Sequence, residues 1–150
     1  DDQRLGHIQV PAALAEEDFI LKRRDGLFAY NLAVVIDDAD SGITEVVRGA
    51  DLIEPTVRQI ALYRLLGAAE PGWLHLPLAL QPNGLKLSKQ NHAPALSGAA
   101  VSPTLCQALT FLGQHPPPEM VGESPQVVLD WACAHWQPEK IPMQAQIQPI

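Results

Sequence analysis

The sequence predicts an α/β fold in which short strands alternate with helices, and two further helices close the chain. The first half alternates short apolar runs with longer segments of helical periodicity. Two later segments both begin with Ser-Pro and carry apolar residues at helical spacing. Hydrophobic residues make up 47% and charged residues 18% of the 150 residues, which is typical of one globular domain with a core.

Composition also limits the classes of protein to consider. No apolar run approaches the ~20 residues of a membrane span, so we expect no membrane partner. The start, DDQRLGHIQV, has no initiator Met and no signal-peptide region, and it looks like a cut inside a longer protein. The net charge of −7 argues against a non-specific nucleic-acid coat but leaves room for a local basic patch.

The two cysteines predict neither a disulfide nor a metal site. Cys106 and Cys133 lie far apart in expected helices, and neither has a Cys or His at ligand spacing. We therefore expect two buried, reduced thiols, a cytoplasmic protein and no metal ligands in this chain.

The first elements are expected to run strand, helix, strand. Residues 18–24 (DFILKRR) fit a strand that ends at the Asp25-Gly26 turn. The apolar run 32–36 fits a buried strand or a buried helix equally well by periodicity. A helix is favoured because acidic residues follow it and residues 42–49 (GITEVVRG) supply a separate strand pattern.

Residues 54–67 (EPTVRQIALYRLLG) predict a second helix. Pro55 suits its first turn, and Gly67 can end it in the left-handed conformation. The residues expected on its buried face are Val57, Ile60, Ala61 and Leu65.

The later elements are a strand, a turn and two helices. The strand lies in WLHLPLAL (residues 73–80), and Asn83-Gly84 forms the turn. Helices are predicted within residues 102–113 and 124–136, joined by a proline-rich linker.

A loop with two lysines follows the turn. GLKLSKQNHAPAL, residues 84–96, brings Lys86, Ser88 and Lys89 close together. Ammonium groups, a hydroxyl and loop N–H groups can cradle a polyphosphate and stabilise the charge on leaving pyrophosphate. Taken alone, the loop fits a solvated turn better, and the absence of GxxxxGK[ST] excludes a P-loop.

The surrounding sequence favours the phosphate interpretation. KLSK resembles the second, KMSKS-like signature of class I aminoacyl-tRNA synthetases. The ordered text AYNLAVVIDDADSGITEVVRGADLIEPTVRQIALYRLLG, followed by HLPLALQPNGLKLSKQ, resembles the second half of the catalytic domain in the glutamyl-tRNA synthetase family. The resemblance covers roughly residues 16–113. Gln90, NHAPAL and the early end of the chain are similar to the short paralogue branch, which lacks the anticodon-binding region.

The resemblance implies a fold and a division of the chain. We expect the C-terminal half of a class I synthetase nucleotide-binding (Rossmann-like) catalytic domain with two terminal helices. Residues 1–100 would form that second half, 101–137 a short helical part, and 138–150 a poorly ordered tail. An exposed half sheet would favour self-association or pairing with the missing half.

The resemblance also implies a reaction. Glutamate would attack the α-phosphorus of ATP, bound with Mg, and the glutamyl adenylate would pass glutamate to the queuosine base of the tRNA(Asp) anticodon. The HIGH-like motif and the zinc-binding cysteines of the family would lie upstream, so these 150 residues alone are expected to be inactive. The alternatives are a truncated ordinary glutamyl-tRNA synthetase acting on tRNA(Glu), and a non-catalytic tRNA-binding module.

Site residues follow from the resemblance position by position. Lys89 would be catalytic, and Tyr30 and Arg48 would hold glutamate. A guanidinium can pair two-fold with a carboxylate and penalises glutamine, which lacks that charge. Alternatively, Tyr30 is a core aromatic and Arg48 pairs with Asp51. The residues expected to bind ATP are Lys86, Leu87, Ser88, Lys89 and Gln90.

Three other titratable residues are given structural roles. His75 lies in the strand after the second helix and is interpreted as structural. Asp37 and Asp38 look like paired acids, but a solvated or capping role is favoured.

Overall fold

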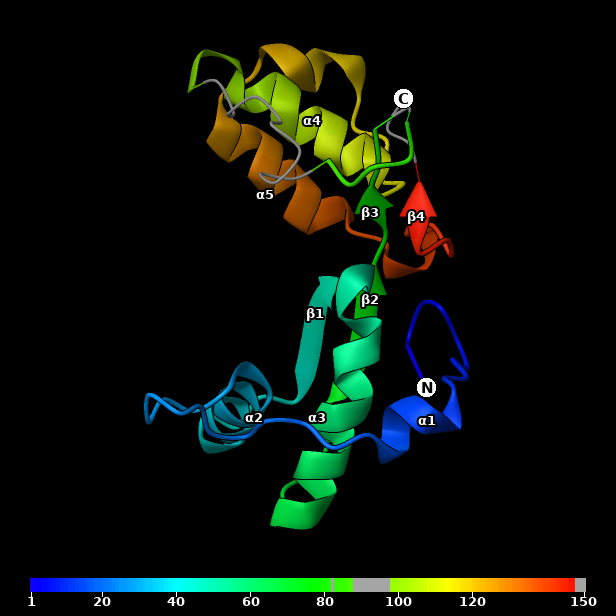
Figure 1. Ribbon diagram of the computed structural model, residues 1–150. Coiled ribbons are helices and arrows are strands. Elements are labelled where there is room, and N and C mark those ends of the chain that lie inside the picture. The colour runs from blue at the N-terminus through cyan, green and yellow to red at the C-terminus, as the bar shows by residue number, and fades with distance from the viewer. Residues whose placement is uncertain (82, 88–97, 148–150) are drawn as a thin grey trace. The chain divides into compact units, whose positions relative to one another are not determined.

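The computed structural model describes residues 1–81, 83–87 and 98–147, which form two compact units, Asp1–His75 and Leu76–Ile150. Both units mix helices with strands, as the α/β prediction requires. The helices are α1 (Ala12–Glu16), α2 (Tyr30–Asp40), α3 (Ile53–Leu66), α4 (Val101–Phe111) and α5 (Pro125–His135). The strands, labelled in Figure 1, are β1 (Glu45–Gly49), β2 (Gly72–Leu76), β3 (Leu78–Ala79) and β4 (Gln146–Ile147). Short 3-10 turns lie at Ala50–Leu52, Gly98–Ala100, Pro118–Gly122 and Pro138–Lys140.

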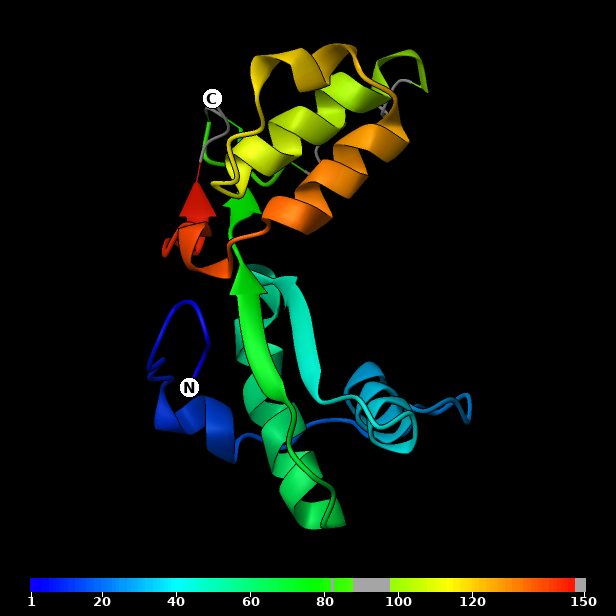
Figure 2. The same ribbon diagram turned by 180° about the vertical axis from the view of Figure 1, so that it is seen from behind.

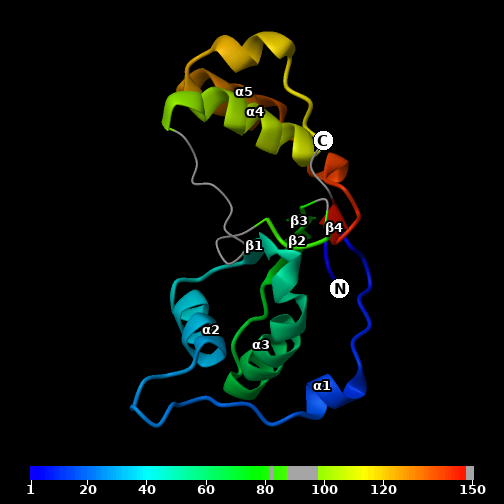
Figure 3. The same ribbon diagram turned by 45° about the horizontal axis from the view of Figure 1, so that its top comes forward.

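The first unit is built on β1, α3 and β2. The two strands pair in one sheet, and α3 is the crossover that parallel strands need. Figure 2 shows both arrows pointing the same way beside α3. Helices α2 and α3 pack side by side, as Figure 3 shows. Their packing buries a core of Val35, Leu62, Tyr63 and Trp73.

The expected strand over residues 18–24 is wrong. The segment forms one isolated antiparallel bridge, between Lys22 and Phe28, and Gly26 lies in the turn with φ 87°. Ile20 is 68% exposed, so its side chain gains little from burial. Without a neighbouring strand, the apolar pattern by itself did not produce a sheet.

The helix prediction for residues 32–36 is confirmed, and so is the helix that ends at Gly67, where φ is 66°. The buried face predicted for the second helix is correct only in part: Val57, Ile60 and Ala61 are partly buried, and Ile60 packs against the core, but Leu65 is 82% exposed. The α3 side chains that are buried are Thr56, Gln59, Leu62 and Tyr63. Two of these, Thr56 and Gln59, are polar and hydrogen-bond to the Leu52 carbonyl oxygen and to the Asn31 side chain, which an apolar-periodicity argument overlooks.

The second unit contains the two predicted Ser-Pro helices. Helices α4 and α5 lie side by side in Figure 1, and Ser124 caps α5 by accepting from the backbone N–H of Val127. Their shared core consists of Cys106, Leu109, Val128 and Ala132. Both cysteines are free, but Cys133 is exposed, contrary to expectation.

Two further differences concern the later strands and the end of the chain. The predicted strand over 73–80 is interrupted at Pro77, which has no N–H to donate, and divides into β2 and β3. The end of the chain, expected to be poorly ordered over 138–150, has structure as far as residue 147. Ile141 is 1% exposed, and β4 pairs in parallel with β3. Because the paired residues of β3 and β4 are 68 positions apart in sequence, local composition gave no sign of this pairing.

No helix in the described ranges has the length and apolar character that crossing a bilayer requires.

Candidate functional site

Arg48, on β1, lies at the centre of a polar cluster in the first unit. Its Nη2 donates to Thr56 Oγ1 at 2.7 Å and to the Leu52 carbonyl oxygen at 3.4 Å. Its Nε donates to His75 Nε2 at 3.4 Å. The guanidinium carbon lies 5.0 Å from the ring centroid of Trp73, in a cation–π contact. The side chain is therefore held from several directions.

The structure brings the two predicted glutamate-binding residues together. Burial lowers the pKa of Arg48, while the nearby Tyr30 acts to raise it. The charges of Asp38 and Tyr63 also favour the protonated guanidinium. Tyr30 is 55% exposed, so it is not a core aromatic. A half-exposed tyrosine thus lies near a partly buried cation, an arrangement that suits a carboxylate arriving from solution.

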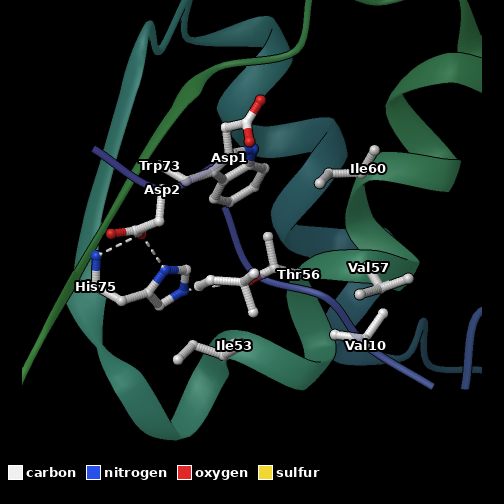
Figure 4. Close-up of a pocket in the computed structure, with 10 residues that line it drawn as sticks. Asp1, Asp2, Val10, Ile53, Thr56, Val57, Ile60, Trp73 and His75 are labelled. Carbon is white, nitrogen blue, oxygen red and sulfur yellow. Dashed lines mark hydrogen bonds and ion pairs between the residues drawn. The ribbon is translucent and has the colours of Figure 1, made fainter. Parts of the chain in front are cut away.

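Behind Arg48 lies a buried pair, Asp2 and His75. His75 Nδ1 lies 2.7 Å from Asp2 Oδ2, which also accepts from the His75 backbone N–H at 2.9 Å. Asp2 Oδ1 accepts from the backbone N–H groups of Arg4 and Leu5, at 2.9 and 2.7 Å. Burial would raise the pKa of Asp2, but these hydrogen bonds outweigh it and the pKa is lowered. Asp2 is therefore a carboxylate held by donors (Figure 4).

A small cavity adjoins this pair. It has a volume of about 70 Å³, and its lining, drawn in Figure 4, combines Asp2, Thr56, Trp73 and His75 with aliphatic side chains. Ligand pockets usually measure roughly 300–1,000 Å³, so this cavity is too small for a nucleotide.

The predicted lysine loop begins in the second unit. Gly84, with φ 81°, turns the chain, and Lys86 forms an antiparallel bridge with Leu80. The Leu87 N–H donates to the Ala79 carbonyl at 2.8 Å, while the Leu87 side chain is 48% exposed. The base of the loop is thus a hairpin. Three of the expected ATP-binding residues lie outside the described residues: Ser88, Lys89 and Gln90.

Within the described part of the chain, no three His, Cys, Asp or Glu side chains come together as a metal site would require.

Most of the residues that contact Arg48, or that hold its partner His75, were not predicted from the sequence. Thr56 was not singled out, although a threonine among apolar residues of a helix suggests a paired hydroxyl. Trp73 and His75 lie on the strand next to β1, so their alternation in WLHL could have placed both beside Arg48. Nothing in the sequence signals Asp2, which reaches His75 across 73 positions.

Comparison with known proteins identifies sequence relatives. The family model described as tRNA synthetases class I (E and Q), catalytic domain, matches residues 1–102. A glutamyl-Q tRNA(Asp) synthetase of Vibrio parahaemolyticus serotype O3:K6 is 57% identical over 148 residues, 99% of this chain and 50% of that protein. The protein of the same name from Serratia proteamaculans is 60% identical, over 94% of this chain and 46% of its own length. The chain spans about half the length of the curated relatives it matches.

A solved structure shares the fold. The glutamate-tRNA synthetase from Elizabethkingia anophelis matches 88% of this chain and 30% of its own, with a TM-score of 0.60 and 22% sequence identity.

Proposed function

Because this chain belongs to the glutamyl and glutaminyl (E and Q) family of class I tRNA synthetases, we propose that it supplies part of the site where a whole enzyme activates glutamate with ATP. Family membership and the shared fold confirm the class I synthetase fold predicted from the sequence. Reaction, substrates and partners belong to the whole protein, since the chain spans half the length of its relatives.

The observation that carries the proposal is the pairing of Tyr30 with Arg48. A preoriented guanidinium and a phenol can bind a carboxylate of glutamate and discriminate against glutamine, which has no charge at that position. The contacts to Leu52, Thr56 and His75 use Nε and Nη2, and none of these contacts uses Nη1. We propose Nη1, which these three contacts do not use, as a donor to the ligand. Two-fold pairing would require Nη2 to release its longer bond to Leu52.

Lys89 is the proposed catalytic residue. Its ammonium group would bind ATP phosphate and stabilise the negative charge that develops on leaving pyrophosphate. Lys86, Leu87, Ser88 and Gln90 would shape the loop and bind ATP with it. Mg bound to the nucleotide would neutralise part of the same phosphate charge.

The proposed acceptor is the queuosine base of tRNA(Asp). The support is the name shared by relatives at 55–60% identity, glutamyl-Q tRNA(Asp) synthetase, together with the short-branch resemblance of the sequence. A cytoplasmic location suits a tRNA substrate. We also propose zinc in the whole protein, on cysteines outside this chain, because the family resemblance of the sequence implies it.

The acceptor is tested with the whole protein, ATP and labelled glutamate. Three substrates are compared: tRNA(Asp) with queuosine, tRNA(Asp) without it, and tRNA(Glu). Label on the queuosine-containing tRNA alone is the expected result. Label on tRNA(Glu) would contradict the acceptor and favour an ordinary glutamyl-tRNA synthetase, and no label on any tRNA would favour a non-catalytic binding module.

A further inference from the structure

We propose that His75 is a positioning residue, which Asp2 holds in one tautomer so that it orients the Arg48 guanidinium for a carboxylate ligand. Only the identity of that ligand, glutamate, rests on the proposed function. The orientation of Arg48 by His75 can be tested without any ligand.

The hydrogen-bond partners of His75 select its tautomer. Nδ1 lies 2.7 Å from Asp2 Oδ2, and a carboxylate can only accept, so Nδ1 carries the hydrogen. Nε2 lies 3.4 Å from Arg48 Nε, which can only donate, so Nε2 must accept. A hydrogen on Nε2 would place two N–H groups face to face. Asp2 and Arg48 therefore require the same neutral form of the ring.

The guanidinium is fixed along one edge. Arg48 Nη2 donates to Thr56 Oγ1 at 2.7 Å while Nε donates to His75, and the two acceptors lie 3.2 Å apart. The Leu52 carbonyl oxygen lies 2.7 Å from the Thr56 hydroxyl. Thr56 and His75 are 7% and 1% exposed, so packing holds both acceptors. A guanidinium that is already oriented loses less side-chain freedom when a ligand binds.

Two His75 variants separate positioning from bulk packing. His75→Leu removes the acceptor, whereas His75→Gln keeps an amide oxygen close to the place of Nε2. In the whole protein, His75→Leu should raise the KM for glutamate about tenfold or more, with kcat and the KM for ATP within about twofold. His75→Gln should restore most of the glutamate affinity. The matched control is His7→Leu, an 80% exposed histidine in the same unit, with no expected effect.

The role of Asp2 is tested by its isosteric amide. Asp2→Asn allows the other tautomer, so the ring ¹⁵N resonances of His75 should shift toward an Nε2–H form. The KM for glutamate should rise in this variant. In the His75→Gln background, Asp2→Asn should add little, because the glutamine acceptor no longer depends on the tautomer. If Asp2→Asn raised the KM for glutamate by the same factor in the His75→Gln background as it does alone, the proposal would be overturned.

The readout that needs no glutamate is the Nε–H resonance of Arg48. In His75→Leu, this resonance should move away from its hydrogen-bonded chemical shift, and the Nε–H should exchange faster with solvent. In His75→Gln, both the chemical shift and the slow exchange should be kept. An unchanged resonance in folded His75→Leu would overturn the positioning role. If His75→Leu fails to fold, the proposal is still tested by comparing the effect of Asp2→Asn on the KM for glutamate in the presence and absence of His75→Gln. If the resonance responds as expected but Arg48→Lys leaves the KM for glutamate unchanged, the proposed function fails and the positioning role stands.

Discussion

At the residue scale, the polar groups around Arg48 are paired, with one conspicuous exception. The Tyr63 hydroxyl is buried and has no hydrogen-bond partner among the described residues. Burial raises the pKa of Tyr63, and the charge of Asp38 acts in the same direction, while Arg48 opposes it. The ring itself packs edge-on against Trp73, with centroids 6.3 Å apart. The ring therefore contributes packing, and the hydroxyl contributes a desolvation cost.

Removing that hydroxyl should not destabilise the protein. A buried unsatisfied polar group costs roughly 1–3 kcal/mol, so Tyr63→Phe should leave the free energy of unfolding unchanged or raise it by about 1 kcal/mol. Urea unfolding measures the difference, with Tyr30→Phe, which removes the hydroxyl of a 55% exposed tyrosine, as the control. A loss of more than about 1 kcal/mol in Tyr63→Phe would mean that the hydroxyl has a stabilising partner.

Asp2 should contribute to acid unfolding. Its folded-state pKa is below the ordinary value of 3.8, so the folded state favours the carboxylate. That contribution is present above the unfolded-state pKa and is lost as the pH falls through the folded-state value. Asp2→Asn should therefore lose less unfolding free energy than the unsubstituted protein between about pH 5 and pH 2. Urea unfolding at several pH values checks this, and parallel curves for the two proteins would contradict it.

At the element scale, local signals decided which predictions were confirmed. The Ser124-Pro125 start of α5 and the Gly67 end of α3 carry their information in adjacent residues, and the structure has both. The strand expected over 18–24 and the buried face of α3 depended on neighbours distant in sequence. Sequence periodicity can propose an amphipathic face, but the partner helix or strand decides which face is buried.

Two helix-ending glycines should respond differently to alanine. Gly67 and Gly113 both have positive φ, 66° and 75°. A Cβ at Gly67 meets nothing within 4 Å, whereas one at Gly113 would lie 2.2 Å from the Lys140 carbonyl oxygen. Gly67→Ala should cost about 1–2 kcal/mol of unfolding free energy, the usual penalty of the left-handed conformation. Gly113→Ala should cost more than about 3 kcal/mol, because the backbone must also move.

Urea unfolding of the two glycine variants provides the comparison. Equal losses would show that the chain around Lys140 moves away at little cost, contrary to the close packing that the structure describes at residue 113.

At the scale of the whole molecule, the long ordered string of residues predicted the family and the fold, and both are confirmed. The glutamate-binding role of Tyr30 and Arg48 stays a prediction. The sequence could not predict the residues that hold Arg48 and its partner in place, which are Thr56, His75 and Asp2. The contact of Arg48 with His75 spans 27 positions, and that of Asp2 with His75 spans 73. Such contacts exist only once β1, α3 and β2 have assembled, so no local pattern encodes them. Lys89 lies outside the described residues, and its role remains a prediction.

The sheet of the first unit bears on association of the chain. In the described residues, β1 pairs only with β2, and Val47 on β1 is 54% exposed. Unpaired strand edges tend to pair with other chains, and a charged side chain on the strand opposes this. We predict that the 150-residue chain self-associates and that Val47→Lys weakens the association. Light scattering after size-exclusion chromatography measures it, and a concentration-independent monomer for the unsubstituted chain would contradict the prediction.

The measurement that tests the central claim most directly is glutamate-dependent ATP–pyrophosphate exchange by the whole protein and its Arg48→Lys variant. Lysine keeps the charge but loses the planar donors that Thr56 and His75 orient. We expect exchange in the unsubstituted protein and at least about a tenfold rise in the KM for glutamate in the variant, with a smaller change in the KM for ATP. No exchange by the unsubstituted protein, or an unchanged KM for glutamate in Arg48→Lys, would contradict the assignment of this site to glutamate activation.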